Sequence, residues 1–242
     1  MRSPDLPGTP LALIAPMEPI QATRRPSGFH ATNFSRLSPT AAFYSTALEL
    51  ELVSIAAFKI MHLELSAYGA PSSILARIAE AEVVKRQHTS LLRGIVREVG
   101  GIDSGIEVSV DRPLRSLEDI AIENVVEGCV RESFGARVAA VQAERVLDPR
   151  HKKVFATIAS DELNHAELAW AVHDWIRPYL GAAGATRVEV ALLRAIDDLW
   201  VDATANYAKE LEATAGLPSP TEMRTLLGEL EQKLWCRDRV AA

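Results

Sequence analysis

Along most of the chain after residue 38, apolar residues recur at alternating spacings of three and four, and this period constrains the fold more than any other feature. Residues at these spacings share one face of an α-helix. The periodic segments are separated by helix-start and helix-stop signals: Ser38-Pro39 precedes the first, and Gly100-Gly101 follows the second. The sequence therefore predicts an all-α protein.

The same signals set the limits of four long helices and two shorter ones. The signals are Ser38-Pro39 and Gly69–Pro71 for the first helix, residues 73–99 for the second, Ser116 with Asp119 for the third, Asp148-Pro149 and Pro178 for the fourth, Thr186 with Glu189 for the fifth, and Ser219-Pro220 with Glu222 for the sixth. Residues 101–115 form a crossover with room for a short strand at Ile106–Val110. Two helical hairpins joined by such a crossover are one arrangement of a four-helix bundle.

These elements divide the chain into three parts. Residues 1–37 are rich in Pro, Ser and Thr without periodicity, which is typical of a flexible arm. Residues 38–180 contain the two hairpins, and we expect them to form the bundle. Residues 181–242 contain the two shorter helices, which we expect to pack on the bundle as a C-terminal extension.

Composition excludes several classes of function. Apolar residues make up 48% of the 242 residues and aromatic residues only 6%, so the core is built from small and aliphatic side chains that suit closely packed helices. A net charge of −6 without a cluster of Lys and Arg argues against nucleic-acid binding. Two cysteines, Cys129 and Cys236, cannot form a disulfide framework. With no uninterrupted run of 18 apolar residues, we expect a cytoplasmic protein that does not span a membrane.

Ionisable residues interrupt the apolar faces of all four long helices. On the fourth helix Glu162 and His165 lie one turn apart within such a face, and Glu51 interrupts the face of the first helix. Burial of an unpaired carboxylate costs several kcal/mol, and a bound cation removes that cost. The remaining ionisable residues on these faces are Lys85 and His88 on the second helix, and Glu127 and Glu132 on the third.

The positions of these residues along the helices predict that they meet in one layer. In an antiparallel hairpin, residues equidistant from the turn lie at the same height, with about 1.5 Å of offset per residue of mismatch. Glu51 and Lys85 are nearly equidistant from the turn at residues 69–71. Glu132 and Glu162 have the same relation to the turn at residues 147–149, and Glu127 falls within a helical turn of that height.

This set of residues resembles the ferritin-like di-iron superfamily, and more closely a group of bacterial ferritin-like proteins. The resemblance covers residues 40–180 and rests on the segments Glu51–Phe58, Gly69–Pro71, Glu127–Glu132 and Asp161–Trp170. It implies a ferritin-like four-helix bundle that binds iron, one or two ions, or manganese. The ligands that it implies are Glu51, His88, Glu127 or else Glu132, Glu162 and His165.

One residue departs from the family pattern. Lys85 stands where the resemblance implies a metal-binding glutamate on the second helix, three residues before His88. A lysine can replace a metal ion as the counter-charge of Glu51 or Glu162, so we expect at most one metal ion per chain.

Two functions follow from this departure. The first is an iron- or manganese-dependent oxidase or oxygenase that acts on a small molecule with dioxygen. If Lys85 excludes the second metal, the site is a one-metal centre at Glu162 and His165 with a helix-three Glu and His88. The alternative is a metal-free scaffold or binding protein that has kept the fold. The sequence is compatible with a homodimer and names no substrate.

Overall fold

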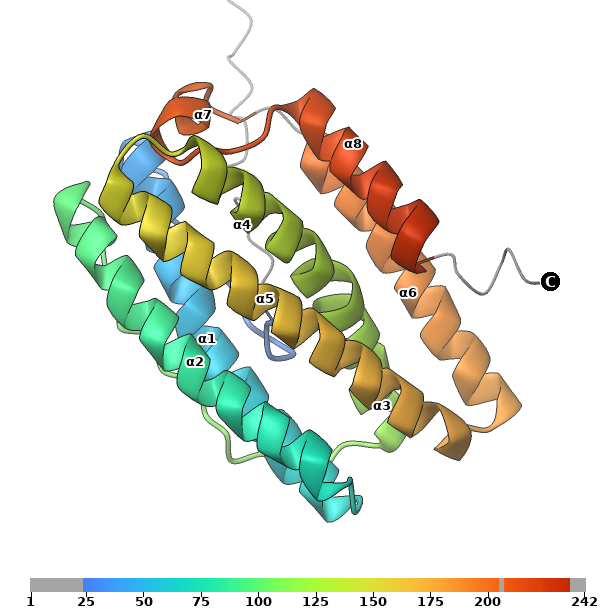
Figure 1. Ribbon diagram of the computed structural model, residues 1–242. Coiled ribbons are helices and arrows are strands. Elements are labelled where there is room, and N and C mark those ends of the chain that lie inside the picture. Colours follow the sequence, from blue (N-terminus) through green and yellow to red (C-terminus); the bar gives the residue numbers. More distant parts are fainter. Residues whose placement is uncertain (1–23, 205–206, 236–242) are drawn as a thin grey trace, which may run out of the picture.

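Every regular element in the described part of this computed structural model, residues 24–204 and 207–235, is a helix (Figure 1). The elements in chain order are α1 (Pro39–Ala67), α2 (Ser72–Glu98), α3 (Leu117–Glu123), η1 (Asn124–Glu132), α4 (Ser133–Arg145), α5 (Pro149–Ile176), η2 (Arg177–Tyr179), α6 (Ala182–Thr204), α7 (Glu210–Thr214), α8 (Pro220–Leu230) and η3 (Glu231–Trp235). This confirms the predicted all-α class. The strand that the sequence allows at Ile106–Val110 is not formed, because residues 101–116 run as a crossover without regular structure.

The first hairpin consists of α1 and α2, which lie side by side (Figure 1). The Ser38 side chain accepts a hydrogen bond from the Ala41 N–H and caps α1, as the Ser-Pro signal predicts. Between the helices the chain turns at Gly69, whose φ of 75° lies in the left-handed region that glycine adopts without strain. The local sequence thus sets both the start of α1 and the reversal that pairs it with α2.

The second hairpin pairs a composite helix with α5. The composite helix runs through α3, η1 and α4, and its middle section η1 is a π-helix. The Asp148 side chain accepts a hydrogen bond from the Arg150 N–H and caps α5 directly after the turn. The two hairpins meet where α5 packs against α2, and the inner faces of the four long helices contribute to two hydrophobic clusters.

Helix α1 is the most deeply buried of the long helices. By length and composition α1 could also cross a membrane, although it contains no uninterrupted run of 18 apolar residues. Of its most apolar 18-residue window, 83% is buried inside the bundle. Core helices of soluble proteins pass the same test of length and composition, so the burial of α1 explains its apolar composition.

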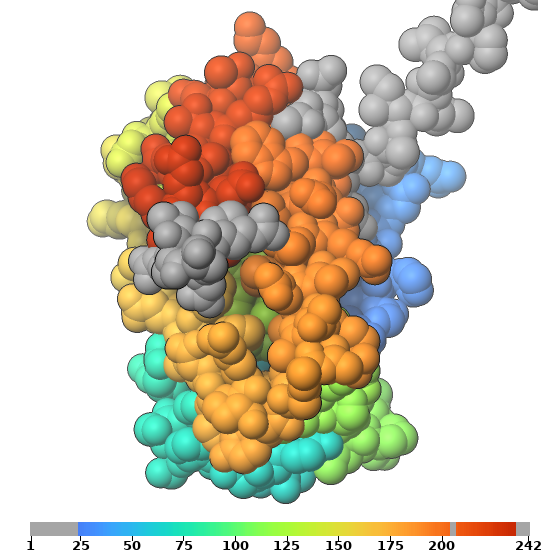
Figure 2. All heavy atoms as spheres, turned by 90° about the vertical axis from the view of Figure 1, so that its right-hand side faces the viewer, coloured from blue at the N-terminus to red at the C-terminus, as the bar shows by residue number. Residues whose placement is uncertain are grey.

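The C-terminal elements cover one side of the second hairpin (Figure 2). Helix α6 packs against α3 and η1, and α8 packs against α6 and α4. Helix α6 begins at Ala182, four residues before the predicted start at Thr186. The Thr186 hydroxyl donates to the Ala182 carbonyl within the first turn, so it is not the N-cap that the sequence indicated.

Residues 24–37, which we call the N-terminal strap, pack along α1, α3 and η1. Arg24 is 1% exposed and Phe34 is buried. The Ser54 hydroxyl on α1 donates to the Arg24 carbonyl, and the Thr32 N–H donates to the Glu49 carboxylate. The sequence predicted a flexible arm over residues 1–37, and the strap differs from that prediction because it is fixed by buried polar contacts. Residues 1–23 lie outside the described residues.

Candidate metal centre

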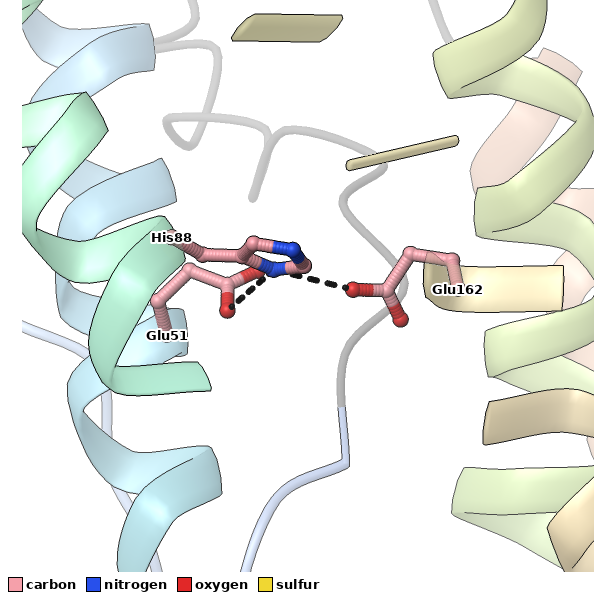
Figure 3. Close-up of side chains that lie close together, drawn as sticks. All are labelled: Glu51, His88 and Glu162. Atoms are coloured by element: carbon pink, nitrogen blue, oxygen red, sulfur yellow. Dashed lines mark ion pairs between the residues drawn. The ribbon is translucent and has the colours of Figure 1, made fainter. Parts of the chain in front are cut away.

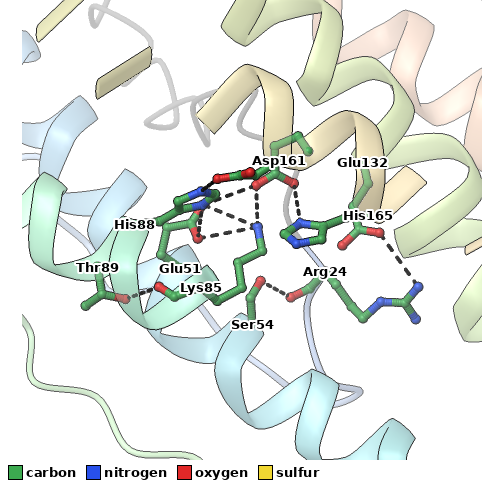
Figure 4. A network of polar contacts seen from close by, with 10 residues as sticks. Arg24, Glu51, Ser54, Lys85, His88, Thr89, Glu132, Asp161 and His165 are labelled. Atoms are coloured by element: carbon green, nitrogen blue, oxygen red, sulfur yellow. Dashed lines mark hydrogen bonds and ion pairs between the residues drawn. The ribbon is translucent and has the colours of Figure 1, made fainter. Parts of the chain in front are cut away.

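Six ionisable side chains meet inside the bundle and form what we call the buried polar layer. None is more than 4% exposed. They come from α1, α2, η1 and α5, so both hairpins contribute (Figure 4). The residues are Glu51, Lys85, His88, Glu132, Glu162 and His165. The layer therefore includes most of the residues that the sequence singled out, and it holds more carboxylates than a solvent-free core tolerates without cations.

Lys85 occupies the centre of the layer. Its Nζ lies 2.5 Å from Glu162 Oε1 and 3.3 Å from Glu51 Oε2. The Nδ1 atom of His88 lies 3.3 Å from the same oxygen of Glu51 and 3.5 Å from the same oxygen of Glu162 (Figure 3). A metal ion held by Glu51, His88 and Glu162 would use these same atoms, so the ammonium group stands in its place.

The electrostatics of the layer keep Lys85 charged. Burial alone lowers the pKa of Lys85, but the charges of Glu162, Glu51 and Glu132 outweigh it and raise the pKa. Burial likewise opposes ionisation of Glu162, yet the Lys85 ammonium lowers the pKa of Glu162 below its ordinary value. A lysine that stays protonated is not a nucleophile, which argues against Schiff-base chemistry at Lys85.

His88 links the layer to the rim of the bundle. Its Nε2 atom lies 2.9 Å from the Oδ2 atom of Asp161, whose side chain is 25% exposed. Burial lowers the pKa of His88, but the charge of Glu51 and its hydrogen bond outweigh burial and raise the pKa. The sequence pattern did not predict a role for Asp161, because only its position next to Glu162 pointed to it.

A second group of ligand atoms lies beside the Lys85 position. One ligand atom from each of Glu132, Glu162 and His165 lies within 4.8 Å of the others. Glu132 is fully buried, and neither of its carboxylate oxygens has a hydrogen-bond partner. Burial raises the pKa of Glu132 above its ordinary value. Two carboxylates and an imidazole in this arrangement could hold a metal ion.

The structure separates the two helix-three candidates. It brings Glu132 into the layer and leaves Glu127 outside it, because the Glu127 carboxylate pairs with Arg25 at 3.1 Å and with Arg131 at 3.8 Å. These ion pairs are partly buried and lie outside the layer. Of the alternatives that the sequence left open, Glu132 is the one with the position of a ligand.

Arg24 is a residue of this region that sequence analysis missed. Its Nη2 atom lies 3.8 Å from Glu132 Oε2 (Figure 4). The same atom lies 2.9 Å from Asn124 Oδ1, and the guanidinium lies over the Phe58 ring. The segment around Arg24 has no helical period, so no face could be assigned to it. The one available signal was the pair Arg24-Arg25 in a segment otherwise poor in charge.

A third group of ionisable residues lies at the surface, where α2 ends near the start of α5. Its members Glu98, Asp148 and His151 are spaced closely enough for a cation. The Arg150 guanidinium already pairs with Glu98 at 2.8 Å and with Asp148 at 2.7 Å. This group is therefore a set of exposed ion pairs that already contains its cation.

Comparison with protein-family models, with curated proteins and with solved structures gave no significant match. What the chain can do therefore has to be inferred from the buried polar layer.

Proposed function

We propose that this chain is a ferritin-like oxidase or oxygenase that holds one iron or manganese ion between Glu132, Glu162 and His165. The observation that carries the proposal is Glu132: both of its buried oxygens lack a hydrogen-bond partner, and one of its oxygens lies within 4.8 Å of a ligand atom of each of the other two side chains. A buried carboxylate in that state is either protonated or awaits a cation. The neighbouring imidazole and the second carboxylate favour the cation.

The residues present fit such an ion. Carboxylate oxygens and an imidazole nitrogen are ligands that suit iron and manganese, and three protein ligands leave positions open for dioxygen. When bound, the metal supplies the oxidation chemistry that protein side chains lack. The position beside it is already taken by the Lys85 ammonium, which supports one ion per chain.

The chain's own residues would prepare the site in three ways. Glu162 uses one oxygen for Lys85 and presents the other toward His165, so a single carboxylate joins the two positions. Asp161 at the rim and His88 inside can pass a proton between solvent and the layer. The apolar faces of the long helices exclude water from the layer, which strengthens its electrostatic interactions.

Metal stoichiometry and dioxygen consumption test the proposal. Protein grown with iron and manganese should contain one of these ions per chain and no more, and ferrous protein should consume dioxygen. Glu132→Gln should lose the metal, because it removes a charged ligand while keeping the shape of the side chain. Glu127→Gln is the matched control on the same π-helix and should keep it. A wild-type chain without bound metal under these conditions would contradict the proposal.

A metal-free scaffold is the second candidate, and the geometry of Lys85 favours it. The ammonium already neutralises Glu51 and Glu162, so the layer can persist without any metal. On this alternative Glu132 is protonated, in agreement with the raised pKa of its carboxyl group. The two candidates differ in one measurement: Glu132→Gln changes metal content in the first and leaves a metal-free protein unchanged in the second.

A further inference from the structure

The N-terminal strap places a second buried cation beside the candidate metal position. Arg24 reaches into the bundle between α1 and η1. Its Nη2 atom lies 3.8 Å from Glu132 Oε2, so its guanidinium is a positive charge close to this carboxylate (Figure 4). That distance is too long for a hydrogen bond, and the Arg24 Nε atom also has no hydrogen-bond partner. Arg24 therefore sits near Glu132 as a counter-charge without being tightly bonded to it.

Charge balance makes Arg24 and a divalent cation alternatives. The layer contains three carboxylates, of Glu51, Glu132 and Glu162, and the fixed cations nearby are Lys85 and Arg24. His88 forms a separate pair with Asp161 at the rim, which does not change this balance. A divalent ion together with Lys85 neutralises three carboxylates. Adding the guanidinium would leave an excess positive charge in a buried site, which is costly.

The strap is held to the bundle by individual polar contacts and has no helix or strand of its own. Besides those of Arg24, the Thr32 N–H donates to the buried Glu49 carboxylate, the Ser27 N–H donates to Glu123, and Arg25 pairs with Glu127. Gly128 makes room for the guanidinium, since a Cβ there would collide with Arg24. The Arg24 side chain thus fills the space beside Gly128, and departure of the strap would remove this side chain from the Glu132 side of the layer.

We propose that Arg24 competes with the metal ion for Glu132, so that binding of a divalent cation and docking of the strap oppose each other. This inference rests on the proposed metal site at Glu132, Glu162 and His165. Because coupling between two binding events is reciprocal, removal of the Arg24 charge must tighten metal binding and metal must loosen the strap. The strap would then control whether the centre is loaded.

Titration with Mn²⁺ tests the first half of this coupling. Arg24→Met keeps an apolar chain over Phe58 and removes the charge, and we expect it to bind Mn²⁺ about tenfold more tightly than the wild type, within the usual range of such couplings. Arg25→Met is the control on the same strap, because Arg25 pairs with Glu127 outside the layer. It should stay within about threefold of the wild-type affinity, because its ion pair involves none of the proposed metal ligands.

Hydrogen exchange of the strap tests the second half and uses the wild-type chain, so it does not depend on how the variant folds. Saturating Mn²⁺ should speed exchange of the peptide 24–37, including the Thr32 amide, and should have no effect in Glu132→Gln. Equal affinities of Arg24→Met and the wild type, with metal bound to both, would overturn the competition and leave the proposed function intact. An equal gain in Arg25→Met would assign the effect to docking of the strap as a whole and would overturn direct competition between the Arg24 charge and the metal for Glu132. Failure of every variant to bind Mn²⁺ would remove the proposed function and the competition together.

Discussion

At the scale of single residues, Lys85 decides what the bundle can bind. Removal of a buried cation from between two carboxylates is costly in free energy, because it leaves the carboxylates as uncompensated buried charges. Its raised pKa means that the ammonium form persists throughout the physiological pH range. Lys85 therefore acts as a permanent counter-charge.

Removal of this charge should destabilise the protein strongly. Lys85→Met leaves Glu51 and Glu162 buried without their cation, and we expect a loss of about 3–5 kcal/mol in the free energy of unfolding. Denaturant unfolding measures it. Lys59→Met is the control, because Lys59 is half-exposed and its ion pair with Glu82 at 3.8 Å is worth about 1 kcal/mol at most. Equal effects of the two substitutions would show that the Lys85 charge contributes little.

Replacement of Lys85 by a carboxylate should have the opposite effect on metal content. Lys85→Glu places a Glu three residues before His88 and leaves the oxygens of Glu51 and Glu162 that the ammonium now contacts free to bind a metal ion. We expect the purified variant to remain folded and to bind two metal ions per chain in place of at most one. Elemental analysis with added ferrous iron measures this. A variant that stays at the wild-type stoichiometry would mean that the remaining ligands do not converge on a second ion.

At the scale of elements, the π-helix η1 marks the limit of sequence prediction. The period of three and four placed Glu51, Lys85, His88, Glu162 and His165 correctly, because α1, α2 and α5 are regular α-helices throughout. In η1 the backbone hydrogen bonds span five residues, so the helical period changes. The period of three and four therefore could not show which of Glu127 and Glu132 faces the layer. Arg24 was beyond prediction for another reason: its position depends on contacts distant in sequence.

The fit between η1 and the strap leads to a prediction on Gly128. A Cβ at this position would lie 2.5 Å from the Cβ of Ala169 and would collide with the Arg24 guanidinium. We expect Gly128→Ala to destabilise the protein by about 1–3 kcal/mol, as overpacking does. Gly94→Ala is the matched control, because no atom lies within 4 Å of a Cβ there and the change in helix propensity favours stability by about 1 kcal/mol. Thermal unfolding measures both, and a stabilised Gly128→Ala would show that the strap gives way easily.

At the scale of the whole molecule, the C-terminal elements are joined to the bundle by polar contacts at the end nearest the α4–α5 turn. The Gln142 side chain on α4 donates to the Ala215 carbonyl, and Gly216 packs so closely that a Cβ would lie 3.0 Å from the Gln142 carbonyl oxygen. Arg145 forms two hydrogen bonds with Glu222 in the first turn of α8. The sequence predicted the capping role of Glu222 in α8, but the pairing with α4 depends on the tertiary arrangement.

This pairing gives the attachment of α8 a specific pH dependence. The hydrogen bond from Arg145, with those of Ser219, lowers the pKa of Glu222 from 4.5 to about 2. Because the folded-state pKa is depressed, the contribution of Glu222 to stability is complete above pH 4.5 and is lost as the pH falls through 2. The difference in melting temperature between the wild type and Glu222→Gln should therefore be largest above pH 4.5 and vanish near pH 2. A difference that is the same at every pH would contradict the ion pair.

The lysine at the centre of the bundle also has a consequence for how the protein is made. A metal ion must be acquired from the surroundings, whereas an ammonium arrives with the polypeptide from the ribosome. The two hairpins can therefore meet and close around their carboxylates as soon as both are synthesised, whatever the supply of iron or manganese in the cell. Folding of the chain would then not depend on the supply of iron or manganese. Only the fraction of chains that contain metal would reflect that supply.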